Sequence, residues 1–194
     1  MSNETFEKKD WFTLIISKVK QNKKILIYLS LTVVIGLFII LFLEKRKNDQ
    51  NIEILKEFNK AKILIENEKK EESYFILKNI INKKHKFYSP SSLYLILDFE
   101  LENNQEEIIR LFDKVISISK IKDEDKDLIK IKKAIFMSNY YGEQDLLKVL
   151  NPIIESKSIW RSSALKIIID YYSIKGDQLK VNEYKKILNN NISQ

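Results

Sequence analysis

The chain of 194 residues contains no cysteine, and that absence excludes a wide range of chemistry. Without thiols the chain forms no disulfide, holds no zinc–thiolate site and offers no cysteine nucleophile. Glycine is also scarce, since three residues in the whole chain are too few for a glycine-rich phosphate-binding loop. Proline occurs twice, and no convincing alternating strand pattern is present, so the composition favours helices.

Residues that could ligate a metal or act in acid–base catalysis are few. His85 is the single histidine and lies in a lysine-rich stretch, so we expect a solvated loop residue. Asp123, Asp125 and Asp127 have the spacing of the first ligands of a calcium loop, but the glycine and glutamate that complete such a loop are missing. These aspartates suit the first turn of a helix instead. We predict no enzyme activity, no cofactor, no metal and no small-molecule substrate.

The positive charge of the chain is spread along it. The formal net charge is +7, from 34 Lys and Arg against 27 Asp and Glu. Arginine, which forms bidentate contacts with phosphates and bases, occurs only at Arg46, Arg110 and Arg161. This distribution disfavours nucleic acid as a partner.

The sequence does contain one long apolar run, which extends from Ile25 to Leu43 and consists mostly of Leu, Ile, Val and Phe. As a helix this run would measure ~28 Å, close to the ~30 Å hydrocarbon core of a bilayer. A cleaved signal peptide would have a shorter apolar core and small residues at its end. Here Leu43 is followed directly by charged residues from Glu44 to Lys47. We therefore predict a retained membrane span with Ile25 and Leu43 at its ends, and membrane lipid as a partner.

The span divides the chain into a tail, an anchor and a domain. Lysine and arginine are equally numerous within about 20 residues on either side, so the positive-inside rule leaves the orientation undecided. The predicted parts are a short tail over 1–24, the transmembrane helix over 25–43, a connector and first helix over 44–66, and helical repeats over 67–194, so that the domain outside the membrane covers 44–194.

The domain carries a fourfold repeat. Apolar residues recur at spacings of three and four, which predicts an all-α fold. Offsets near about 34 residues with a helix–turn–helix in each unit are typical of tetratricopeptide (TPR) arrays. Four segments align without gaps, and each begins with a polar turn and continues as a helix: 67–81, 102–116, 140–154 and 174–188. The repeat turns fall at Lys69, Asn104, Gly142 and Gly176.

These repeats predict a TPR-like α-solenoid of about four helix pairs. One pair alone leaves its apolar face uncovered, whereas three or more stacked pairs enclose a continuous core. The alternative is an irregular helical bundle with four chance hairpins, and the common register of the turns favours the array.

A lysine-bearing tail, one span, a charged connector and a TPR-like domain together resemble the ancillary SecYEG translocon subunit family of bacterial inner membranes, over roughly Lys20 to Asn189. The block Ile159–Ala164 (IWRSSA), followed by Lys175–Asp177 (KGD), is similar to the block that these proteins carry at their last helix pair. The chain departs from the repeat consensus five residues after each turn, where alanine is usual and looser spacing of the helix pairs is expected: these positions hold Tyr74, Ile109, Leu147 and Val181.

The resemblance implies a cytoplasmic N-terminus, a periplasmic domain and a role beside the translocon, with translocon subunits and periplasmic chaperones as partners. We therefore expect an adaptor. The alternative function is a self-assembling envelope scaffold in cell-wall synthesis or division. Tyr94, Tyr140 and Tyr171 could line a partner groove of the array, or they could be core residues with outward hydroxyls, and the sequence leaves both interpretations open.

Overall fold

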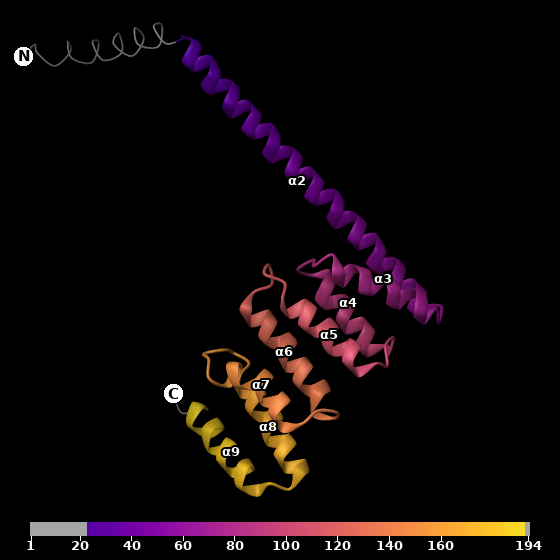
Figure 1. Ribbon diagram of the computed structural model, residues 1–194, viewed down its shortest axis with the longest axis vertical. Helices are drawn as coiled ribbons and strands as arrows, with labels where there is room; N and C mark the ends of the chain where they lie inside the picture. The colour runs from indigo at the N-terminus through magenta and orange to yellow at the C-terminus, as the bar shows by residue number, and fades with distance from the viewer. Residues whose placement is uncertain (1–22, 193–194) are drawn as a thin grey trace, which may run out of the picture. The chain divides into compact units, whose positions relative to one another are not determined.

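The computed structural model describes residues 23–192, and the regular secondary structure in this range is α-helix, with short turns between the helices (Figure 1). No strand occurs within this range, so the prediction of an all-α fold is confirmed. The predicted tail falls outside the described residues up to position 22. The helices are α2 (Lys23–Glu66), α3 (Lys70–Asn82), α4 (Tyr88–Asp98), α5 (Gln105–Ile116), α6 (Asp123–Ser138), α7 (Glu143–Ile154), α8 (Arg161–Lys175) and α9 (Gln178–Ile192).

The chain divides into two units, and the boundary between Glu53 and Ile54 falls inside the continuous helix α2. In the first unit, the large apolar side chains described between Ile27 and Leu43 are each about half exposed or more. The hydroxyl groups of Ser30 and Thr32 donate to backbone carbonyls one turn earlier, at 2.9 and 2.8 Å, so these polar side chains are satisfied within the helix.

Among the residues whose side chains the structure describes, no helix combines the length and the apolar character that crossing a membrane requires. The predicted span includes Ile25, Leu26 and Leu29, and the side chains of these three residues lie outside the described set.

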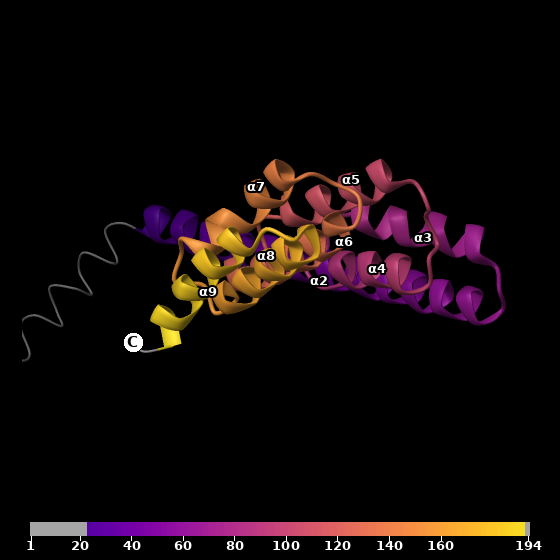
Figure 2. The ribbon, with the colours of Figure 1, turned by 90° about the horizontal axis from the view of Figure 1, so that it is seen from below.

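The second unit, Ile54–Gln194, is built from consecutive helices that pack on one another. The views show two layers, with α3, α5 and α7 in one and α4, α6 and α8 in the other (Figures 1 and 2). The contacts of α3 with α5 and of α6 with α8 agree with this arrangement. Each helix of the second layer is thus followed in the chain by a helix of the first layer or by α9.

The repeat turns lie between these helices. Lys69, Asn104 and Gly142 directly precede α3, α5 and α7, and Gly176 follows α8. Gly176 has φ 75°, in the left-handed region where glycine is favoured because it lacks Cβ. The Gly176 N–H donates to the Ser173 carbonyl at 3.2 Å and the Asp177 N–H donates to the Tyr172 carbonyl at 3.0 Å, and these bonds satisfy carbonyls at the end of α8.

In chain order the helices are grouped into the pairs α2–α3, α4–α5, α6–α7 and α8–α9. The first helix of each pair contains a small side chain with no exposed surface. The three alanines of the chain are Ala61 in α2, Ala134 in α6 and Ala164 in α8, and each is 0% exposed. In α4 the corresponding small buried residue is Ser92. A small side chain lets a neighbouring helix approach closely.

The core passes from one helix pair to the next through α6. One apolar cluster extends from the end of α2 to Ile129, with Phe112 fully buried within it. The other begins at Ile131 and extends to α9, with Leu150 and Leu165 fully buried. Because α6 contributes to both clusters, neighbouring pairs share their burial, as expected when each unit contacts only the next.

We expect Ala164→Leu to lower the free energy of unfolding by ~1–3 kcal/mol, because the added methylenes have no space in a fully packed site. Ser162 is exposed on the same helix, so Ser162→Leu is the matched control and should change stability by less than ~0.5 kcal/mol. Urea unfolding of the full chain in detergent, followed by circular dichroism, measures both. An Ala164→Leu variant as stable as the control would contradict close helix packing at this residue.

Candidate functional site

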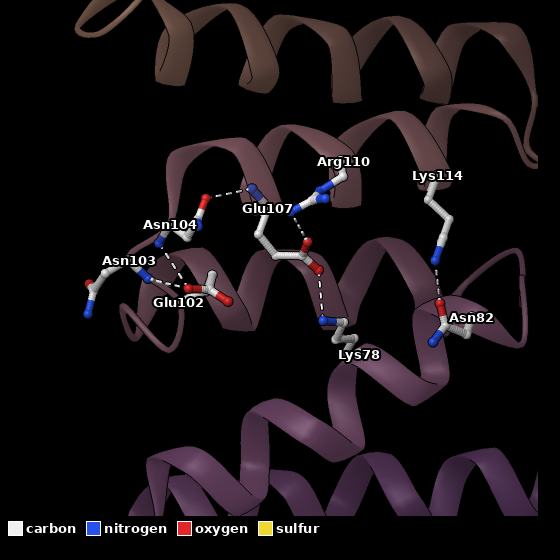
Figure 3. Close-up of polar contacts among 8 residues, drawn as sticks. All are labelled: Lys78, Asn82, Glu102, Asn103, Asn104, Glu107, Arg110 and Lys114. Atoms are coloured by element: carbon white, nitrogen blue, oxygen red, sulfur yellow. Dashed lines mark hydrogen bonds and ion pairs between the residues drawn. The ribbon is translucent and has the colours of Figure 1, made fainter.

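A set of polar contacts joins α3 to α5 (Figure 3). The Glu107 carboxylate lies 2.8 Å from Nζ of Lys78 on α3 and 2.9 Å from Arg110 on its own helix. Further along, Lys114 Nζ donates to the Asn82 side-chain oxygen at 2.6 Å. The hydrogen-bonded Lys78 ammonium holds the pKa of Glu107 below its usual value. Helices α3 and α5 are therefore held together by charge as well as by apolar contact.

The turn before α5 is fixed by its own side chains. Asn104 Oδ1 accepts a hydrogen bond from the Glu107 N–H at 3.1 Å and so caps α5. Glu102 Oε1 accepts from the backbone N–H groups of Asn103 and Asn104, both at 2.9 Å. These bonds give the turn one defined shape, which matters because Glu102 and Asn103 also line a cavity.

That cavity has a volume of about 600 Å³ and lies between α4, α6 and the turn before α5. A volume of this order is typical of sites that bind ligands or partner side chains. Its wall combines apolar and charged groups: Tyr94, Leu97, Asp98, Glu100, Glu102, Asn103, Gln105, Ile108, Lys132, Ile135, Phe136, Asn139 and Tyr140.

Aromatic rings form part of this wall. The Phe136 ring centroid lies 5.3 Å from that of Tyr140 and 6.3 Å from that of the buried Phe112, so Phe136 connects the wall to the core. Tyr140 is 56% exposed. The half-buried Tyr94 ring lies under the Lys132 ammonium, with Nζ 4.5 Å from the ring centroid. Burial, helped by the Asp125 charge, raises the pKa of Tyr94 to about 12, so its hydroxyl is neutral at physiological pH.

A second cavity of about 310 Å³ adjoins the first, since Asn139 lines both. It lies between α6 and α8 and includes Asp170, Tyr171 and Ile174. Lys175 Nζ lies 5.6 Å from the Tyr171 ring centroid. We call the two cavities together the groove, and it follows the layer formed by α4, α6 and α8.

The sequence left open whether three tyrosines line a partner groove or belong to the core, and the structure shows where each of them lies. Tyr94 and Tyr140 line the first cavity and Tyr171 lines the second. Tyr171 is also a core residue, because only 7% of its surface is exposed. Sequence reasoning missed Ile135 and Phe136 of α6, which line the first cavity. Phe136 lies four residues before Tyr140, and this helical spacing could have indicated it.

The first cavity is acidic although the chain as a whole is basic. Asp98, Glu100 and Glu102 line it against a single lysine, Lys132. Neither Asp98 nor Glu100 forms an ion pair with any described residue. Helix α4 ends at Asp98 and has no basic residue in its last turn, so the negative end of the helix dipole adds to the same field.

Within residues 23–192, no group of three or more His, Cys, Asp or Glu side chains is arranged to hold a metal ion. Asp123 and Asp125 lie in the first turn of α6, as the sequence predicts, whereas Asp127 lies just beyond that turn. His85 lies in the loop before α4, as the sequence predicts, and its ring is partly rather than fully exposed, because Nδ1 accepts hydrogen bonds from the N–H groups of Phe87 and Tyr88 at 3.2 and 3.1 Å. His85 shapes the turn before α4, and its burial lowers its pKa.

The lowered pKa of Glu107 predicts a pH-dependent stability. The carboxylate contributes fully above the unfolded value of about 4.3, and its contribution is lost as the pH falls through the lower folded pKa. Glu107→Gln should therefore reduce the free energy of unfolding at pH 7 by roughly 0.5–1 kcal/mol, and the difference from wild type should shrink below about pH 4.

Urea unfolding at pH 7 and at about pH 3.5 measures this difference. Glu155→Gln is the control, because Glu155 is exposed at the end of α7 and forms no ion pair with a described residue. A Glu107 variant whose deficit is equal at both pH values would show that the ion pair with Lys78 does not stabilise the folded chain.

Comparison of the chain with protein-family models, with curated proteins and with solved structures finds no match. The chemistry of the groove is accordingly inferred from the residues that line it.

Proposed function

We propose that this chain is a membrane-anchored adaptor that binds protein partners through the groove. The observation that supports the anchor is the uncovered apolar surface between Ile27 and Leu43, where large side chains on all sides of α2 are exposed. A helix that is apolar all round needs an apolar environment. In this proposal, lipid covers the run from Ile25 to Leu43 and holds the second unit at the membrane surface.

The second unit is, in this proposal, a TPR-like solenoid of about four helix pairs. Its support is the order of the helices in two layers, the regular position of the turns and the core that passes through α6. Solenoids of this kind present a continuous surface along one layer of helices and bind polypeptides there. The groove along α4, α6 and α8 has this position.

We propose the SecYEG translocon and periplasmic chaperones as the protein partners, with the N-terminus in the cytoplasm and the second unit in the periplasm of a bacterial inner membrane. This part of the proposal rests on the family resemblance of the sequence. Tethering at the membrane raises the effective concentration of a nearby partner, so a groove of modest affinity is sufficient.

A self-assembling envelope scaffold is the second candidate, and one observation favours it. Ile174 and Leu179, on either side of the turn at Gly176, are 86% and 85% exposed. Apolar residues at the last turn of a stack suit contact with another copy. Size-exclusion chromatography of the full chain in detergent separates the candidates, because the scaffold predicts concentration-dependent oligomers and the adaptor predicts a monomer.

The anchor is tested by alkaline carbonate extraction of membranes from cells that express the full chain. We expect the wild type to stay in the pellet. The pair Val34→Asp and Leu37→Asp should move the protein to the supernatant, because charged residues at the centre of a span cost ~2.5–3.5 kcal/mol each. The matched control is Ile52→Asp with Leu55→Asp, at exposed apolar positions of the same helix outside the predicted span. Equal behaviour of the two double variants would contradict the anchor.

The adaptor role is tested by crosslinking intact cells and purifying the chain from solubilised membranes. We expect translocon subunits in the purified sample. Recovery without any of them, under conditions that keep the translocon assembled, would contradict this partner.

The proposed orientation has its own test. Protease added to spheroplasts should digest the second unit, and full protection of this unit until lysis would place it in the cytoplasm instead.

A further inference from the structure

The chemistry of the groove restricts what can occupy it. Asp98, Glu100 and Glu102 line the first cavity together with Lys132, and Asp170 lines the second together with Lys175, so the negative charge of the groove lies in the first cavity. A groove with this charge repels nucleic acid, anionic lipid headgroups and acidic peptides. Positively charged groups are attracted to it, although the chain itself has a net charge of +7. The negative charge of the groove is thus a local property that the net charge of the chain does not reveal.

Two lysine side chains of the groove itself already lie against aromatic rings that line it. The Lys132 ammonium lies on the Tyr94 ring at 4.5 Å, and the Lys175 ammonium lies on the Tyr171 ring at 5.6 Å. These contacts show that a lysine side chain fits beside the rings that line each cavity. Asp98 and Glu100, in contrast, form no ion pair with any described residue, so they are available to a cation supplied by a partner.

Apolar surface lies beside these carboxylates. Ile135 and Tyr140 are 52% and 56% exposed, and both line the first cavity together with Phe136. When an apolar group of a partner covers exposed apolar side chains in a concave surface, binding is favoured because apolar surface is removed from water. The occupant therefore needs apolar side chains next to its positive charges.

We propose that the groove binds an extended polypeptide segment in which Lys or Arg residues lie close to aromatic or branched aliphatic residues. The positive side chains pair with Asp98 and Glu100, and the apolar side chains cover Ile135, Phe136 and Tyr140. In an extended segment, residues two apart point to the same side, so a basic and an apolar residue at that spacing reach the same wall. This inference rests on the proposed adaptor function and adds the class of sequence that the adaptor recognises.

The test uses the full chain in detergent and a fluorescein-labelled peptide of about nine residues, ~30 Å when extended, that contains Lys and Phe two apart. Fluorescence anisotropy measures its affinity. Two comparison peptides replace every Lys by Glu or every Phe by Ala. We expect the original peptide to bind at least about tenfold more tightly than either, with affinity that falls as salt is raised.

Variants of the chain locate the binding site. Asp98→Asn with Glu100→Gln should weaken binding about tenfold, and Tyr140→Ala about fivefold. The matched control is Glu155→Gln with Glu183→Gln, which removes two exposed carboxylates on α7 and α9 and should leave affinity within about twofold. Circular dichroism verifies that every variant is folded, since all five positions are exposed.

Equal affinity for the Lys and Glu peptides, or equal weakening by the groove and control double variants, would overturn the proposal. Binding of the Ala peptide as tightly as the Phe peptide would also overturn it, because charge alone would then suffice. These outcomes are independent of the anchor and of the translocon. The Val34→Asp and Leu37→Asp variant should keep its peptide affinity, and a chain that recovers translocon subunits but fails to bind the peptide refutes the groove chemistry alone.

Discussion

Each helix pair of the second unit has more apolar surface than its two helices can cover, and the stacking of consecutive pairs provides the missing cover. This constraint explains why the three alanines of the chain are all completely buried, in α2, α6 and α8. It also explains why α6 contributes to both apolar clusters. A helix in the middle of such a stack must bury residues on two sides. Ile135 on α6 and Tyr140 in the turn that follows it line the groove.

The same constraint applies to the first unit with a different result. Between Ile27 and Leu43 the described apolar side chains have no protein neighbour that covers them. Their own helix continues without a break to Glu66 and contributes Ala61 to the core of the second unit. One helix thus has an exposed apolar half and a half that is part of a folded core. The proposal that lipid covers the exposed half joins the two halves into one function.

Much of the helical order could be predicted from the sequence, because it depends on local signals. The repeat places Lys69, Asn104 and Gly142 directly before helices, and Gly176 directly after one. Two of these positions have a local chemical reason, because the Asn104 side chain caps α5 and Gly176 takes the left-handed conformation that ends α8. The four first helices are also constrained by small side chains, but the sequence alone does not reveal that an alanine is buried rather than exposed. That property depends on which neighbouring helix lies against it.

The groove was harder to predict because it depends on tertiary packing. Tyr171 is both core and groove residue, and no sequence pattern distinguishes these positions. Asp98 and Glu100 belong to the end of α4 and the turn that follows, and they meet Phe136 only because α6 packs beside that end. His85 differs, because the hydrogen bonds that its Nδ1 accepts are local and come from the N–H groups of Phe87 and Tyr88. Contacts between residues far apart in the sequence decide the first two cases.

The central claim is that polypeptide partners bind along the layer of α4, α6 and α8. Site-specific photocrosslinking in cells tests it most directly, with the photoreactive residue placed at position 140 in the groove or at position 75, which is Phe75 and is 60% exposed on α3 in the other layer. The account predicts adducts with membrane or secreted proteins from position 140 that are lost when Asp98 and Glu100 are neutralised, and few from position 75. Equal adducts from both positions, or adducts from position 75 alone, would contradict it.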